Sequence, residues 1–145
     1  MTPEERETHY FEEIHSRLED LTRWICESSG GQSDAARRKL EEFHDEQRQA
    51  GHWHPWLTEA VADFTKDRSL AVELYKRALE EAKELWEPAQ SILISLGATL
   101  HELGQTEQAE AFVRDGRKEA QDEGDEYAVE KANRLLRDFA EGGSG

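Results

Sequence analysis

The 145-residue chain contains a single cysteine, Cys26, and only three prolines. One thiol excludes an internal disulfide, and no reactive neighbour accompanies it in the sequence. Scarce proline and abundant glutamate, alanine, leucine, lysine and arginine favour helix, because these residues lose little rotamer freedom in a helix. No alternating β-branched run continues for four residues, so strands are not expected. The composition therefore predicts an all-α protein.

Basic residues are few relative to acidic ones: 18 lysines and arginines against 33 aspartates and glutamates give a net charge of -15. This excess repels phosphate groups, which argues against nucleic acid and an anionic membrane surface as partners. No apolar run approaches the ~20 residues that span a bilayer. The acidic start at Thr2–Glu5 differs from a signal peptide, so we expect a cytoplasmic location.

Motifs typical of catalysis are also missing, since the chain has no nucleophile elbow, phosphate loop or dinucleotide fingerprint. Two Glu-x-x-His pairs, Glu12 with His15 and Glu41 with His44, resemble the carboxylate motifs of di-metal bundles. At about 100° per residue, however, both glutamates fall outside the apolar stripes of their helices and face solvent. We therefore predict no catalytic residues, no metal site and no cofactor.

A second histidine-rich segment surrounds Trp53, with His52 and His54 on either side and Trp56 beyond. Two imidazoles in a turn provide only two metal ligands, and no cysteine or carboxylate nearby completes a set of four. Packing of the two tryptophans against the start of the next helix is the preferred interpretation. Trp86, like Trp24, is expected in the core or at its rim.

Seven helices are predicted from the apolar spacing and the turn signals. Their ranges are about 3–27, 33–50, 55–65, 68–86, 88–103, 106–123 and 126–141. Ser33 and Thr106 are expected to cap the second and sixth of these, and Thr2 the first. Leu85 and Tyr127 are counted among the inward-facing side chains. One domain is expected over residues 1–141, divided into a hairpin over 1–51 and repeats with a cap over 52–141, and residues 142–145 form a flexible tail.

The segment from Gln90 to His101 holds no charged residue in a chain that is 35% charged. A helix packed by neighbours on both sides has this composition, so we expect it to be the buried centre of the fold. Gly97 inside this helix costs ~1 kcal/mol relative to alanine, and close approach of a neighbouring helix would account for it. Ala109 and Gly116 are the expected facing residues.

An internal repeat relates three of the predicted helices, because their apolar positions match at offsets of 38 and 35 residues. The positions Ala71, Tyr75, Ala78, Ala82 and Leu85 correspond to Ala109, Val113, Gly116, Ala120 and Glu123 at the offset of 38. They correspond to Ala36, Leu40, Phe43, Gln47 and Ala50 at the offset of 35. Periods of this length are typical of stacked helix pairs.

The positions Leu96, Gly97, Leu100, Gly104, Ala109, Val113 and Gly116 resemble the signature of the tetratricopeptide repeat. The resemblance covers Trp56 to Phe139, and the long period is similar to extended bacterial variants of this repeat. It implies a right-handed α-solenoid of about three helix-turn-helix pairs with a C-terminal capping helix. It also implies a concave wall, formed by the first helix of each pair, that binds a protein segment.

The residues that this resemblance places on the concave wall are polar or acidic. They are Glu59, Asp63, Gln90, Ser91, Ser95, Thr99 and Glu102. We expect an interaction scaffold or adaptor that binds a polar or basic protein segment there. One alternative is an immunity protein, antitoxin or secretion chaperone that neutralises one basic partner, by analogy with other small acidic helical proteins. Another is a metal or small-ligand binder that uses the histidines.

Overall fold

The computed structural model describes residues 3–142, with side chains from residue 12 onward except that of Gln32. Over this range the chain forms helices and no strand, which confirms the all-α prediction. The helices are α1 (Pro3–Glu27), α2 (Gly31–Gln49), α3 (Pro55–Phe64), α4 (Arg68–Leu85), α5 (Gln90–Glu102), α6 (Thr106–Glu123) and α7 (Glu126–Gly142). The predicted cap at Thr2 and residues 143–145 of the predicted tail lie outside the described residues, whereas Gly142 ends α7.

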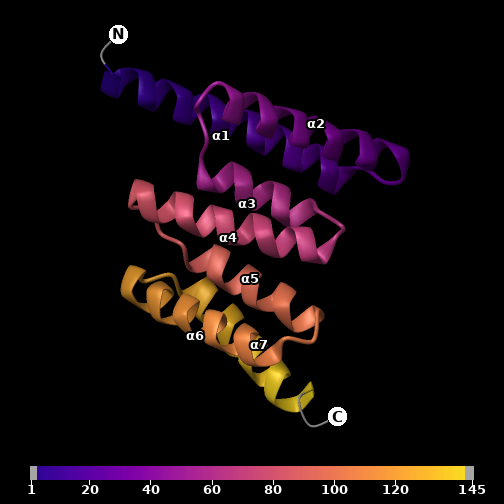
Figure 1. Cartoon of the computed structure of the whole chain (residues 1–145), viewed down its shortest axis with the longest axis vertical. Coiled ribbons are helices and arrows are strands. Elements are labelled where there is room, and N and C mark those ends of the chain that lie inside the picture. Colours follow the sequence, from indigo (N-terminus) through magenta and orange to yellow (C-terminus); the bar gives the residue numbers. More distant parts are fainter. Residues whose placement is uncertain (1–2, 143–145) are drawn as a thin grey trace. The chain divides into compact units, whose positions relative to one another are not determined.

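The helices fall into two compact units, an N-terminal unit of residues 1–64 and a C-terminal unit of residues 65–145. In the N-terminal unit α1 and α2 form an antiparallel hairpin, and α3 contacts both (Figure 1). In the C-terminal unit α5 contacts α4, α6 and α7, and α6 also contacts α7. The helix that contains the uncharged segment 90–101 is therefore the central helix of its unit, and Ile92, Leu96 and Leu100 are buried in it.

Three of the predicted helix starts were wrong. Helix α2 begins at Gly31 without a side-chain cap, so Ser33 lies inside its first turn and is buried. Thr106 is the first residue of α6 rather than its cap, and its hydroxyl lies 3.1 Å from His101 Nδ1. The helix expected from Pro88 begins two residues later. Asp67, in contrast, caps α4 by accepting hydrogen bonds from two backbone amides of its first turn.

The repeat at an offset of 38 is visible in the burial pattern of α4 and α6. Four of the five matched pairs are buried on both helices, and the fifth pair, Leu85 and Glu123, is exposed on both. Leu85 was predicted to face inward, but it is the last residue of α4, where the chain turns away. Tyr127 is also exposed, because it lies about 100° from Ala128 and about 140° from Ala132, the buried positions near the start of α7.

Helices α5 and α6 approach each other closely at Gly97. A Cβ at this position would lie 2.8 Å from the carbonyl oxygen of Ala109 and would overlap the Val113 side chain. Ala109 therefore faces Gly97 as predicted. Gly116 does not, because a Cβ there would meet Ile94 at 2.8 Å and the Gln90 carbonyl oxygen at 3.1 Å, nearer the start of α5. Gly97 on α5 and Gly116 on α6 thus allow the two helices to come close at two places.

Candidate functional site

One face of α5 is accessible although most of the helix is buried. Ser91, Ser95, Ala98 and Glu102 follow one another at spacings of four, three and four residues, which places them within about 60° on the helix surface. Ser91 and Glu102 are exposed, and the other two are half-buried. We call these four residues the α5 stripe. Three of them belong to the predicted partner-binding set.

Two further predicted residues of α5 do not lie on this stripe. Thr99 is only 3% exposed and its hydroxyl donates a hydrogen bond to the Ser95 carbonyl oxygen at 2.9 Å, so its assignment to the surface was wrong. Gln90 lies about 100° from Ser91 around the helix. Its side-chain amide donates to Asp125 Oδ2 at 3.2 Å, which ties the start of α5 to the turn between α6 and α7.

Glu102 provides the only formal charge of the α5 stripe. Its carboxylate lies 3.7 Å from the guanidinium of Arg68, which comes from the start of α4. The same guanidinium donates a hydrogen bond to the Thr65 carbonyl oxygen at 2.6 Å. Arg68 is thus held in place by its own helix start, and any change at Glu102 also changes this ion pair.

The remaining two predicted residues belong to the N-terminal unit. Glu59 and Asp63 lie four residues apart on α3 and therefore share a face of that helix. Asp63 is exposed and Glu59 is half-buried. Both residues make further interactions within the chain.

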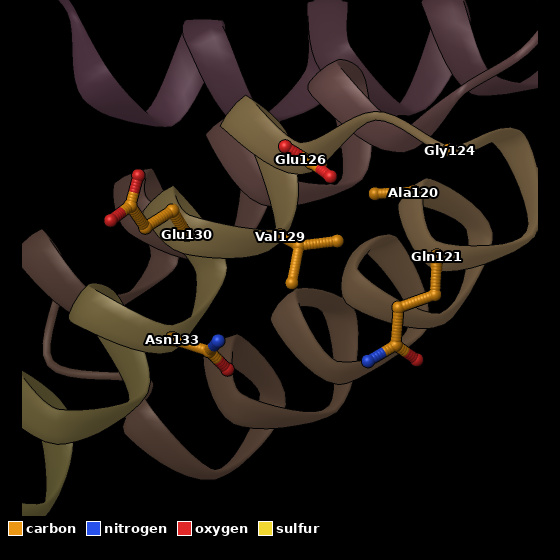
Figure 2. A pocket seen from close by; sticks show the side chains of 7 residues that line it. All are labelled: Ala120, Gln121, Gly124, Glu126, Val129, Glu130 and Asn133. Carbon is orange, nitrogen blue, oxygen red and sulfur yellow. The ribbon is translucent and has the colours of Figure 1, made fainter.

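A cavity of about 510 Å³ lies between α6 and α7 (Figure 2). Its walls are formed by Ala120, Gln121, Gly124, Glu126, Val129, Glu130 and Asn133. Glu126 and Glu130 are exposed, and Asn133 accepts a hydrogen bond of 2.9 Å from Arg117 that joins the two helices. No sequence pattern predicts this cavity, because it depends on how the two helices diverge after the turn at Gly124.

His54 of the N-terminal unit has a structural role. His54 precedes α3, and its Nδ1 accepts a hydrogen bond from the Trp56 backbone amide at 3.2 Å, as an N-cap does. The His54 and Trp56 rings also stack edge to face at 4.8 Å. His54 is 7% exposed, and this burial lowers its pKa from 6.5 to about 4. His54 is therefore neutral at pH 7, and its side chain caps the start of α3.

A second buried histidine links α2 to α3. His44 Nε2 lies 3.3 Å from the hydroxyl oxygen of Thr58, and that hydroxyl donates to the His54 carbonyl oxygen at 3.4 Å. Since the single Thr58 proton is used in this way, His44 Nε2 is the donor of the first bond. Thr58 is fully buried, so the bridge between the two helices is shielded from water.

The two glutamates of the Glu-x-x-His pairs, Glu12 and Glu41, are exposed as predicted. His15 packs its ring against Trp56 at 5.6 Å. Among the residues whose side chains the structure describes, no group of three or more histidines, cysteines or acidic residues is placed to hold a metal ion. The described helices also include none that is long and apolar enough to cross a membrane.

A family model described as Tetratrico peptide repeat matches residues 56–140, more than half of the chain. The matched range agrees with the resemblance seen in the sequence from Trp56 to Phe139. Searches of the curated proteins and of the solved structures give no match.

Proposed function

Because the chain belongs to the tetratricopeptide repeat family, in which a role in protein–protein interaction is the rule, we propose that it binds a polar or basic segment of a partner protein. Members of this family are generally scaffolds without catalytic activity. The proposed contact surface is the α5 stripe, with Glu59 and Asp63 of α3 as further candidates. A cytoplasmic location remains a prediction.

The observation that carries this proposal is the contrast between the two sides of α5. Most of the helix is buried against its neighbours, and the stripe leaves two serines, one alanine and one carboxylate accessible. Short side chains allow a partner backbone to come close, and serine hydroxyls can donate and accept hydrogen bonds. With a net charge of -15, the chain attracts cationic segments and repels anionic ones.

A display library of random 12-residue peptides, selected against the whole chain, tests the proposal. We expect the selected peptides to be enriched in lysine, arginine and uncharged polar residues. Ser95→Arg places a long cation on the stripe, so we expect it to weaken binding of these peptides at least tenfold in fluorescence anisotropy. Gln108→Arg adds the same charge at an exposed position of α6 and should leave binding unchanged. Acidic selected peptides, or equal binding to both variants, would contradict the proposal.

A charge exchange separates the role of Glu102 in binding from its ion pair with Arg68. Glu102→Lys alone removes the pair and the carboxylate together. The double variant Arg68→Glu, Glu102→Lys restores opposite charges across the same gap but leaves a cation on the stripe. We expect both variants to bind a selected basic peptide weakly. If the double variant regained affinity for the peptide, Glu102 would contribute to folding through its ion pair with Arg68 and not to binding.

A further inference from the structure

Helices α4 and α6 end with the same backbone turn, 38 residues apart. Trp86 has φ 57°, and its amide donates to the carbonyl oxygens three and four residues earlier. Gly124 has φ 73° and makes the same pair of bonds. In each turn the next amide donates back to the carbonyl oxygen five residues earlier, at 2.9 Å from Glu87 and 2.8 Å from Asp125. Glycine favours this left-handed conformation and tryptophan does not.

The backbone therefore does not explain a tryptophan at the end of α4. Burial does not explain it either, because the Trp86 side chain is 94% exposed. Trp86 is also the only residue other than glycine with a positive φ among the described residues. A large apolar ring that strains the backbone and packs against nothing in its own chain indicates a role outside folding.

Other exposed apolar side chains lie at the same end of the C-terminal unit. The Ala89 amide donates to the Glu119 carboxylate at 2.6 Å, and Gln90 donates to Asp125. These bonds hold the linker after α4 against the last turn of α6 and the start of α7 (Figure 1). Leu85 is 42% exposed and Tyr127 is 76% exposed. We call these three exposed residues, Leu85, Trp86 and Tyr127, together the tryptophan end.

The charge around the tryptophan end has one sign. Residues 84–90 and 119–130 contain eight acidic residues and no lysine or arginine, although Lys83, Lys118 and Lys131 flank these two stretches. Glu123 and Glu126 are exposed, and neither makes an ion pair with a described residue. Such a surface repels phosphate groups of membranes and nucleic acids. It attracts arginine and lysine, whose cations also bind the face of an indole ring.

We propose that the tryptophan end docks a cationic segment of the partner protein, with an arginine or lysine over the Trp86 ring and the surrounding carboxylates balancing its charge. The α6–α7 cavity, with Glu126 and Glu130 in its wall, begins beside this surface and offers room for a second basic side chain. The inference rests on the proposed function, because the molecule that binds at the tryptophan end is a segment of the partner protein. It adds a second contact region and the chemistry that this region recognises.

Trp86→Gly tests the inference because folding and binding should respond in opposite directions. Glycine relieves the strained conformation, so we expect the melting temperature to rise by about 3 °C. Binding of the library-selected basic peptides should weaken at least tenfold. Tyr127→Ala should weaken binding of these peptides less than Trp86→Gly does. Peptides that bind Trp86→Gly as tightly as the unchanged chain, yet lose affinity for Ser95→Arg, would overturn the inference and leave the proposed function intact.

A charge-matched pair of variants tests the acidic surroundings. Glu123→Gln with Glu126→Gln removes two charges at the tryptophan end, and Glu73→Gln with Glu107→Gln removes two exposed charges toward the other ends of α4 and α6. We expect only the first pair to lower affinity, by roughly fivefold at ~0.1 M salt, where the screening length is ~10 Å. Equal losses would overturn the inference. Self-association of the unchanged chain that Trp86→Gly abolishes would also overturn it, since the occupant would then be a second copy.

Discussion

Helices α1, α2 and α3 of the N-terminal unit have the same pattern of neighbours as α5, α6 and α7 of the C-terminal unit. In each set the first helix contacts the second and third, and the second contacts the third. The side chains at these contacts differ. In the C-terminal unit glycines bring α5 and α6 together, whereas in the N-terminal unit Leu40 and Phe43 are buried together with the polar bridge from His44 to Thr58.

This difference shows that one arrangement of helices can be built with two kinds of contact. The family pattern depends on small residues at fixed positions, and these are present in α5 and α6. In α2, Ala36 stands at the position of Ala109, but the large Phe43 stands at the position of Gly116. The family match begins only at residue 56. Three variants sharpen this comparison, because each should affect one unit and leave the other unchanged.

The largest effect is expected from Gly97→Ala. The added methyl group would meet the Ala109 backbone oxygen and the Val113 side chain, and a backbone atom cannot move aside as a side chain can. We expect the C-terminal unit to lose about 3 kcal/mol of unfolding free energy. Urea unfolding followed by circular dichroism measures this loss. Gly31→Ala in α2, where a Cβ would meet nothing within 4 Å, is the control and should be neutral or slightly stabilising.

Acid should destabilise the N-terminal unit through His54. Its folded-state pKa of about 4 lies below the ordinary value of 6.5, so the unfolded chain binds more protons between these values. The contribution of neutral His54 to the unfolding free energy is present above pH 6.5. It is lost as the pH falls toward 4, by no more than about 3 kcal/mol. Fluorescence of Trp24, Trp53 and Trp56 during urea unfolding follows this unit.

His54→Asn separates titration from capping, because an asparagine oxygen can accept the Trp56 amide hydrogen bond without titrating. At pH 7.5 the variant should keep most of the stability of the unchanged chain. Between pH 7.5 and pH 4.5 it should lose less unfolding free energy than the unchanged chain does. A variant with the same acid sensitivity as the unchanged chain would show that other groups cause it.

A smaller effect is expected from Thr58→Val, which keeps the shape of the side chain and removes its hydroxyl. His44 Nε2 then loses its hydrogen bond to the Thr58 oxygen, so we expect a loss of about 1–2 kcal/mol from the N-terminal unit. Thr99→Val is the matched change in the C-terminal unit. Its buried hydroxyl bonds only the Ser95 carbonyl oxygen one turn earlier, so less than about 0.5 kcal/mol should be lost. Equal losses in fluorescence- and dichroism-monitored urea unfolding would contradict the role given to the histidine bridge.

Sequence periodicity was sufficient to predict the helices and the contact of Gly97 with Ala109, because both depend on spacing within one or two helices. It placed Ser91, Ser95 and Glu102 on the accessible side of α5 for the same reason. It failed at Thr99, whose burial depends on where the neighbouring helices lie. It also failed at Trp86, which was expected in the core or at its rim, because only the left-handed turn after α4 reveals that the indole points into solvent.

The four tryptophans allow the central claim to be tested in one experiment. Three of them belong to the N-terminal unit, and Trp86 alone belongs to the C-terminal unit. A ¹⁵N-labelled chain gives one indole N–H signal for each, and Trp86→Gly assigns the signal of interest. On titration with a selected basic peptide, we predict that the Trp86 indole and the amides of the α5 stripe shift. Shifts confined to Trp24, Trp53 and Trp56, with Trp86 unmoved, would contradict the account.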